Sequence, residues 1–352
     1  MRMTTAVVVP VLVAGTLAAA SPAAVAAPAV TSRRQAAAPF TVNGYFLGVA
    51  ATSARNAWAV GSAGGRSLIV HWNGTAWRRV PSPNLASSGF LASVAVVSRR
   101  DAWAVGGGLI VHWNGRSWSR SRWPRPGGYP NLSSVAATSA RNAWAVGSAG
   151  GKTLVVHWNG RAWRRVASPN PPGGGVLSGV TASGGQAWAV GGYLGGYCGG
   201  YRTLVLHWNG RAWRRVPSPT SGNGGPLWAV MASARGTWAV GGCAKTMILR
   251  PAGSGWKQVP APSPPGSGPD AGSAYRGLAA ASSREVWAVG YVTGTRSPAL
   301  IVRWNGRAWR RVLGLPAGSL SAVAVTSPRN AWAVGGSGSK TLILRWNGTS
   351  WR

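Results

Sequence analysis

Carboxylates are nearly absent from this sequence of 352 residues, which has three Asp and Glu residues against 37 Lys and Arg. The three are Asp101, Asp270 and Glu285. A glycosidase needs two carboxylates that face each other across a sugar, and these three are too scattered to do so. The four His residues each precede a Trp at the same place in a repeat, and the Ser residues have no His–acid partner set. We therefore expect no enzyme, no metal site and no cofactor.

Long apolar runs are also missing, apart from one at the N-terminus. Arg2 precedes the run AVVVPVLVAGTLAAA, and Ala24-Val25-Ala26 resembles a small-x-small cleavage site. The run is shorter than the roughly 20 residues of a transmembrane helix. These features predict a signal peptide over residues 1–26, cleaved after about Ala26, and a secreted protein without an integral membrane span. An uncleaved anchor is the alternative.

What the sequence has is a repeat, with the segment WAVG as its marker. The marker Trp residues are Trp58, Trp103, Trp144, Trp188, Trp238, Trp287 and Trp332. Their spacing is 41 to 50 residues. Gly and Pro interrupt each unit every eight to twelve residues, which excludes a helical repeat and favours several short strands per unit.

One unit shows four strand patterns. In the third unit these are Leu132–Ser139, Asn142–Gly147, Thr153–Trp158 and Ala162–Val166. The apolar runs AWAV and LVV suit a sheet that is buried on both faces, as a propeller blade is. The Asn159-Gly160 turn provides the positive φ that hairpins require, and Trp158 and Trp163 can pair across it. The sequence predicts an all-β, seven-bladed β-propeller with four antiparallel strands per blade.

These motifs resemble the propeller repeats of secreted actinobacterial proteins, in which WAVG is followed by HW[ND]GxxW. In layout they are similar to Kelch, BNR and galactose-oxidase-type propellers. The resemblance covers roughly residues 40–352 and implies the fold, but says little of function. The Asp of the family's turn is Asn in nearly every unit here, which removes any carboxylate site that a relative might have.

The repeat also sets the domain organisation. Residues 27–38 are expected to be a flexible leader, and residues 39–352 a single propeller. The approximate blade limits are 46–82, 90–123, 132–168, 177–218, 227–260, 275–313 and 320–352. The last unit stops at Trp351-Arg352 and lacks most of its fourth strand. We expect residues near 39–44 to pair there and close the ring; a sequence that is incomplete at its C-terminus is the alternative.

Cys198 and Cys243 are the only cysteines, and both fall between the second and third strands of their units, in blades four and five. Neighbouring loops on one face make a disulfide the favoured prediction in an oxidising compartment. It would close a loop of about 45 residues and contribute on the order of 3–4 kcal/mol. Two free thiols are the alternative.

The formal net charge of +34 indicates attraction to polyanions. One basic residue precedes the third strand in six blades, and together these are expected to form an anion-binding ring on one face: Arg66, Lys152, Arg202, Lys245, Arg296 and Lys340. The opposite face and the outer strands are basic too, however. The charge therefore fits either selected polyanion binding or Arg drift at exposed repeat positions.

The resulting hypothesis is a non-catalytic binding or scaffold module, expected to be a monomer. Its expected partners are anionic polymers (a wall polymer, an acidic polysaccharide or nucleic acid) or surface proteins. A lectin-like module for neutral glycans is the alternative, because Trp123, Tyr129, Tyr193, Tyr197 and Tyr201 lie in loops expected to be exposed. A polysaccharide lyase or hydrolase of a propeller class is a remote third.

Overall fold

The structure is a computed structural model that describes residues 40–83, 89–193, 200–219, 225–233, 236–262, 272–293 and 298–352. All of them belong to one compact unit, Ala37–Arg352. Within these ranges the regular elements are β-strands, and no helix is present that could span a membrane. The predicted signal peptide and leader lie outside the described residues.

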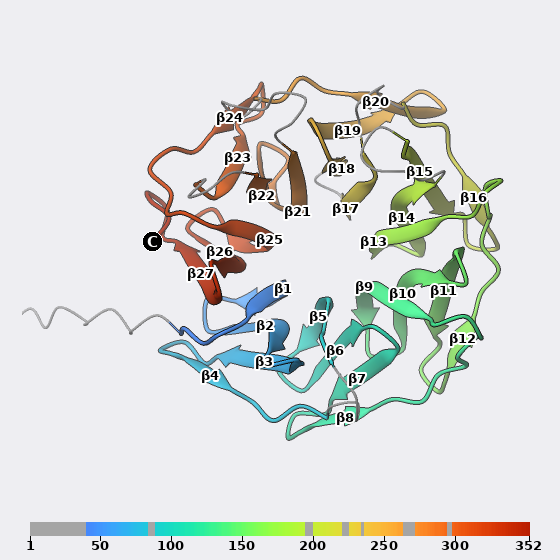
Figure 1. Ribbon diagram of the computed structural model, residues 1–352, viewed down its shortest axis with the longest axis horizontal. Coiled ribbons are helices and arrows are strands. Elements are labelled where there is room, and N and C mark those ends of the chain that lie inside the picture. The colour runs from blue at the N-terminus through green and yellow to red at the C-terminus, as the bar shows by residue number, and fades with distance from the viewer. Residues whose placement is uncertain are drawn as a thin grey trace, which may run out of the picture. The chain divides into compact units, whose positions relative to one another are not determined.

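The strands form seven sheets, which are arranged as blades around a central axis (Figure 1). The first three blades are β1 (Tyr45–Ser53), β2 (Asn56–Ala63), β3 (Arg66–Trp72), β4 (Trp77–Arg79); β5 (Ser93–Ser98), β6 (Asp101–Gly106), β7 (Leu109–Trp113), β8 (Trp118–Arg120); and β9 (Asn131–Ser139), β10 (Asn142–Ala149), β11 (Lys152–Trp158), β12 (Trp163–Arg165).

The other four blades repeat this order. They are β13 (Val176–Ser183), β14 (Gln186–Tyr193), β15 (Arg202–Trp208), β16 (Trp213–Arg215); β17 (Leu227–Ser233), β18 (Gly236–Gly242), β19 (Thr246–Ala252), β20 (Gly255–Gln258); β21 (Ser273–Ser282), β22 (Glu285–Val292), β23 (Leu300–Trp304), β24 (Trp309–Arg311); and β25 (Ser319–Ser327), β26 (Asn330–Ser337), β27 (Lys340–Trp346). Sequential strands pair antiparallel, and the first strand of each blade lies nearest the axis (Figure 1). The predicted seven-bladed propeller is confirmed.

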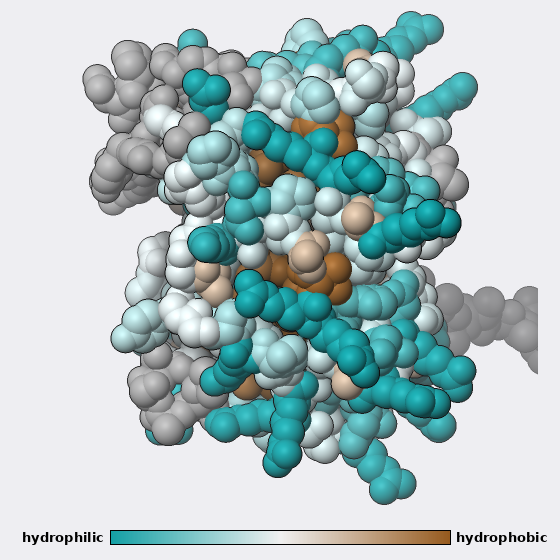
Figure 2. Space-filling view, turned by 90° about the vertical axis from the view of Figure 1, so that its right-hand side faces the viewer, coloured by the Kyte–Doolittle hydropathy of each residue, from teal (hydrophilic) through white to brown (hydrophobic). Residues whose placement is uncertain are grey.

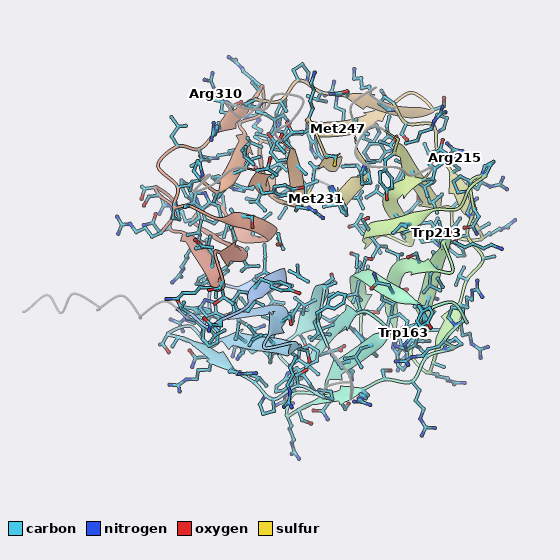
Figure 3. All side chains as sticks on the ribbon, in the orientation of Figure 1. Trp163, Trp213, Arg215, Met231, Met247 and Arg310 are labelled. Atoms are coloured by element: carbon cyan, nitrogen blue, oxygen red, sulfur yellow. The ribbon has the colours of Figure 1, made fainter. Side chains whose placement is uncertain are left out.

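Tryptophans fill the spaces between blades. Trp103 of β6 is 2% exposed; its ring lies 4.2 Å from that of His112 and meets the edge of Trp163, from the next blade, at 5.1 Å and 90°. Trp163 and Trp213 occupy equivalent positions in the third and fourth blades (Figure 3). Edge-to-face packing is a favoured geometry for aromatic rings. The core is therefore a set of seven apolar layers between blades.

The W-N-G-x-x-W hairpin has the geometry that its sequence predicts. Trp158 and Trp163 are directly paired, with ring centroids 5.9 Å apart. Asn159 Oδ1 accepts hydrogen bonds from the backbone N–H groups of Arg161 and Ala162, both at 3.0 Å. Gly160 has a φ of 91°, which is why glycine follows asparagine in this turn.

Asp101 and Glu285 are the first residues of β6 and β22 and contact the outer end of the third strand. Asp101 Oδ1 lies 2.8 Å from His112 Nε2. Glu285 Oε1 lies 3.0 Å from Arg303 Nη2, an ion pair without hydrogen-bond geometry. In the third blade Asn142 has the same role, 2.7 Å from His157 Nε2. Both carboxylates are thus occupied by structural contacts.

Both ends of the propeller contribute to the outer edge of blade seven. Val42 and Thr341 exchange hydrogen bonds of 3.0 and 3.1 Å, and Asn43 pairs with Lys340. Further along β27, Arg345 and Arg352 exchange backbone hydrogen bonds of 2.7 and 3.0 Å. The expected ring closure is present over residues 42–44, and the C-terminal residues share the same edge.

Candidate functional site

The propeller has two faces, each built from particular turns. On one face, the turns between second and third strands meet the links between blades: Gly89 N–H donates to Gly65 O at 2.9 Å, and Gly150 N–H to Gly128 O at 2.8 Å. On the other, the first-to-second-strand turn meets the W-N-G hairpin, where Trp158 Nε1 donates to Ala140 O at 3.0 Å. We call these the link face and the hairpin face.

The predicted basic ring belongs to the link face. Arg66, Lys152, Arg202 and Lys340 are the first residues of β3, β11, β15 and β27, Lys245 directly precedes β19, and all five are exposed. Arg296 lies outside the described residues. Because these five residues come from five different blades, they are spread around the face and do not converge on a point.

A β-bulge in the first strand lies closer to the axis. The pairing of β21 with β22 shifts register between Tyr275 and Gly277, which leaves Arg276 unpaired between them. The same shift occurs in β1, β9, β13, β17 and β25. Bulges of this kind aim a side chain away from the regular strand pattern.

The glycine of WAVG makes the bulge possible. A Cβ atom on Gly147 would lie 1.8 Å from the carbonyl oxygen of Asn131 in the first strand. In all seven blades a Cβ on the equivalent glycine would lie 1.8–2.3 Å from a backbone carbonyl oxygen in or just before the first strand. Only glycine lets the second strand come this close to the first, which explains why the WAVG glycine is present in all seven repeats.

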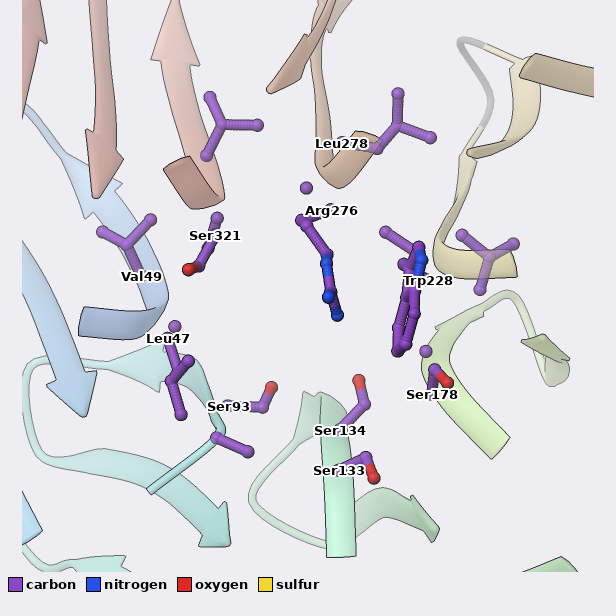
Figure 4. Close-up of a pocket in the computed structure, with 18 of the residues that line it drawn as sticks. Leu47, Val49, Ser93, Ser133, Ser134, Ser178, Trp228, Arg276, Leu278 and Ser321 are labelled. Carbon is purple, nitrogen blue, oxygen red and sulfur yellow. The ribbon is translucent and has the colours of Figure 1, made fainter. Parts of the chain in front are cut away.

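The bulge in six blades places one residue each around the mouth of the central channel, and in blade two Ala92 lines the mouth at the equivalent position. These seven residues, the mouth ring, are Leu47, Ala92, Ser133, Ser178, Trp228, Arg276 and Ser321. Arg276 alone among them is charged. They line a cavity of about 710 Å³, whose other residues include Val49, Val94, Val180, Val230, Leu278 and Val323. Figure 4 shows the Arg276 side chain projecting into this channel beside Trp228.

Two aromatic rings hold Arg276. Its guanidinium carbon lies 3.7 Å from the centroid of the Trp228 ring and 5.4 Å from that of Tyr291. Trp228 is itself fixed, because its Nε1–H donates to the carbonyl of Gly242 at 3.0 Å. The adjacent Tyr275 is fully buried and burial raises its pKa to about 12, so its hydroxyl stays neutral. In the described part of the chain, Arg276 therefore contacts the rings of Trp228 and Tyr291, and no negatively charged group lies beside its guanidinium.

A second cavity of about 730 Å³ adjoins the mouth. It shares Leu47, Tyr291, Ser319 and Ser321 with the first and extends toward the β26–β27 turn at Ser337 and Gly338. The hollow therefore runs from the mouth ring outward across blades six, seven and one.

The aromatic residues behind the lectin-like alternative have different environments. Trp123 is partly buried against the layer between blades two and three, and Tyr193 is 7% exposed beneath Arg215, whose guanidinium carbon is 4.5 Å from its ring centroid. Tyr129, in contrast, is 99% exposed and has a φ of 52°. Tyr201 is partly exposed, and Tyr197 lies outside the described residues.

Cys243 is disulfide-bonded. Cys198, its predicted partner, lies outside the described residues.

The outer rim is also strongly polar. Arg164 and Arg165 of β12 and Arg214 and Arg215 of β16 lie in exposed outer strands, and Figure 2 shows long hydrophilic side chains over this side of the ring. Positive charge is therefore not confined to the link face. The link face differs from the rest of the surface in having the mouth ring, where one residue from each blade lies around the central channel.

Sequence reasoning missed Arg276 and Trp228. Aligning the seven first strands would have shown one charged and one large aromatic residue at a position that holds Ser, Ala or Leu elsewhere. The sequence alone does not show that the bulge turns side chains at this first-strand position toward the axis.

No family model matches the sequence, and no curated protein matches it either. Solved β-propellers do resemble it. YCF48 bound to D1 peptide is 16% identical, with a TM-score of 0.59 over 87% of this chain and 96% of that chain. YCF48 from Cyanidioschyzon merolae is 18% identical, with a TM-score of 0.61 over 89% and 98%. The WD40 propeller of Doa1 is 13% identical, with a TM-score of 0.60 over 86% and 95%. At these identities the likeness shows the propeller fold alone.

Proposed function

We propose that this protein is an exported, non-catalytic binding module whose link face binds anionic polymers. A propeller is consistent with a binding or scaffold role, and one of the similar structures carries a bound peptide. The observation that supports an anionic partner is the unbalanced charge. Against 37 Lys and Arg residues stand three carboxylates, and the two described ones already pair with His112 and Arg303.

Unpaired surface cations attract a polyanion mainly by releasing its condensed counterions. For nucleic acids, each neutralised phosphate contributes about 0.7–0.9 to the slope of log K against log salt. Four ring residues in contact with the polymer would therefore account for a slope of about 3. The ring residues Arg66, Lys152, Arg202 and Lys340 each begin a rigid strand at an exposed position, so neutralising them should not disturb the blades.

The experiment compares two sets of four substitutions that remove equal charge from opposite faces. The test set is Arg66→Gln, Lys152→Gln, Arg202→Gln and Lys340→Gln. The matched control set lies in the hairpin turns and is Arg116→Thr, Arg161→Thr, Arg211→Thr and Arg307→Thr. Blades one and seven naturally carry Thr75 and Thr349 at this turn position, where each hydroxyl donates to the preceding Asn at 2.8 Å.

Binding of the exported chain is measured by calorimetry over a salt series, with polyglucuronate and a single-stranded oligonucleotide as polyanions and dextran as a neutral glycan. We expect the test set to reduce the slope by about 3 and the control set to change it by less than 1. An equal reduction by both sets would refute a binding face and support diffuse charge. Salt-insensitive binding to dextran would refute the polyanion proposal in favour of the lectin-like alternative.

A further inference from the structure

The mouth ring contains one cation whose position differs in kind from the exposed basic ring. The bulge at Arg276 turns its side chain toward the axis, and stacking on Trp228 at 3.7 Å fixes the guanidinium plane. A guanidinium stacked on an aromatic face keeps the N–H groups along its edge available. Arg276 is therefore preorganised as a donor inside the channel, whereas the basic ring residues extend into solvent.

Arg276 has no protein acceptor in the described part of the chain. None of its guanidinium N–H groups hydrogen-bonds there, and the two described carboxylates pair elsewhere. Glu285 begins β22, whereas Tyr291, beside Arg276, is near the other end of the same strand. The hydroxyls of Ser133, Ser178 and Ser321, at equivalent mouth positions, also lack hydrogen-bond partners among the described residues. A few convergent polar groups in an apolar pocket indicate a ligand site, and a guanidinium without a protein acceptor favours an anionic ligand there.

The surroundings define which anion suits the site. A single guanidinium balances one negative charge and matches a planar carboxylate in a bidentate geometry. A phosphate dianion would require a second cation, and the mouth ring has none. Next to the mouth, the channel wall is aliphatic, with Val49, Val180, Val230, Leu278 and Val323 among its residues.

We propose that the central channel binds a carboxylate on a short apolar stem, with the carboxylate held by Arg276 and the stem against the aliphatic wall. Serine hydroxyls of the mouth ring provide the further polar contacts. A free carboxylic acid offers this chemistry, and so does the carboxyl terminus of a peptide that ends in an apolar residue. This site does not depend on the proposed polymer-binding function.

The test measures binding of small probes to the full chain by calorimetry. N-acetyl-leucine carries the proposed group, N-acetyl-leucine amide lacks its charge, and glucuronate and phenyl phosphate vary the stem and the anion. We expect saturable binding of N-acetyl-leucine that exceeds binding of the other three. If a peptide ending in Leu binds more tightly than N-acetyl-leucine, the natural ligand is a peptide carboxyl terminus. If the two bind equally, the ligand is a small carboxylic acid.

Arg276→Ser is the decisive variant, because Ser178 and Ser321 occupy the same position in other blades and the fold accepts them. Loss of a hydrogen bond to a charged group predicts a 10- to 100-fold weaker affinity for N-acetyl-leucine. Trp228→Ala, which removes the stacking surface, should weaken binding while leaving the charge in place. Lys152→Gln, on the exposed ring of the same face, is the control and should leave binding unchanged.

Several outcomes would overturn the proposal. They are equal affinity of the wild-type protein and Arg276→Ser, equal binding of the acid and its amide, or tighter binding of glucuronate or phenyl phosphate. The two proposals fail separately: the four-residue ring variant should retain N-acetyl-leucine binding, and Arg276→Ser should retain nearly all of the salt dependence toward polymers.

Discussion

The glycine of the WAVG segment provides a sharp test of how the blades are built. In Gly147→Ala the new Cβ would lie 1.8 Å from the Asn131 carbonyl oxygen, 2.8 Å from its carbonyl carbon and 2.9 Å from the Leu132 Cα. All three atoms are backbone, so no side-chain rotation relieves the contact. Gly147 does not have a positive φ, and the penalty is therefore steric and not conformational.

Overpacking of a core costs about 1–3 kcal/mol and occasionally more. Because the opposing atoms belong to the bulged backbone, we expect a loss of about 3 kcal/mol in the free energy of unfolding, as measured by urea denaturation. The matched control is Gly127→Ala, since Gly127 also has no positive φ and a Cβ there would meet nothing within 4 Å.

For Gly127→Ala we expect a change within about 0.5 kcal/mol, as for other surface substitutions. Equal stability of Gly147→Ala and Gly127→Ala would refute the reasoning that close approach of the first strand makes this glycine necessary. A large loss in both variants would also refute it, because the control lacks the steric contact.

Three further predictions concern packing, protonation and strain. Trp103→Ala should cost about 3–5 kcal/mol in urea denaturation and more than Trp188→Ala. Trp103 contacts two Trp rings of the next blade, whereas Trp188 contacts one among the described residues, Trp256, because Pro251 replaces the other Trp. Equal costs would contradict the role of the paired tryptophans. Burial lowers the pKa of His71, His157 and His207 below 6.5, with the charge of Arg99 a second cause at His71. Since the folded state favours the neutral rings, the free energy of unfolding should be highest above pH 6.5 and fall as the pH drops toward 5. If changing all three to Gln leaves this pH dependence unaltered, these histidines are not its cause. Tyr129→Gly should raise the melting temperature. A non-glycine residue in the left-handed region costs about 1–2 kcal/mol, and the Tyr129 side chain, 99% exposed, contributes no packing that would be lost. An unchanged melting temperature would show that Tyr129 is not strained.

The sequence determined the architecture because its signals are local and are repeated seven times. Apolar runs, Gly-containing turns and the W-N-G-x-x-W hairpin each specify a short strand or turn, and their period counts the blades. In the third blade, the predicted strand Thr153–Trp158 is β11, Lys152–Trp158, and the predicted Ala162–Val166 is β12, Trp163–Arg165. Agreement is this close because antiparallel hairpins are formed by residues that are neighbours in the sequence.

The site required the tertiary structure. Arg276 occupies a position in the first strand where other blades have Ser, Ala or Leu, and nothing local shows that a bulge turns it toward the axis. Its contact with Trp228 joins blades five and six. The pairing of Asp101 with His112 likewise became visible only when the second and third strands were placed in register. Hairpins follow from local sequence, whereas the channel exists only where seven blades converge and bring residues from distant repeats to one axis.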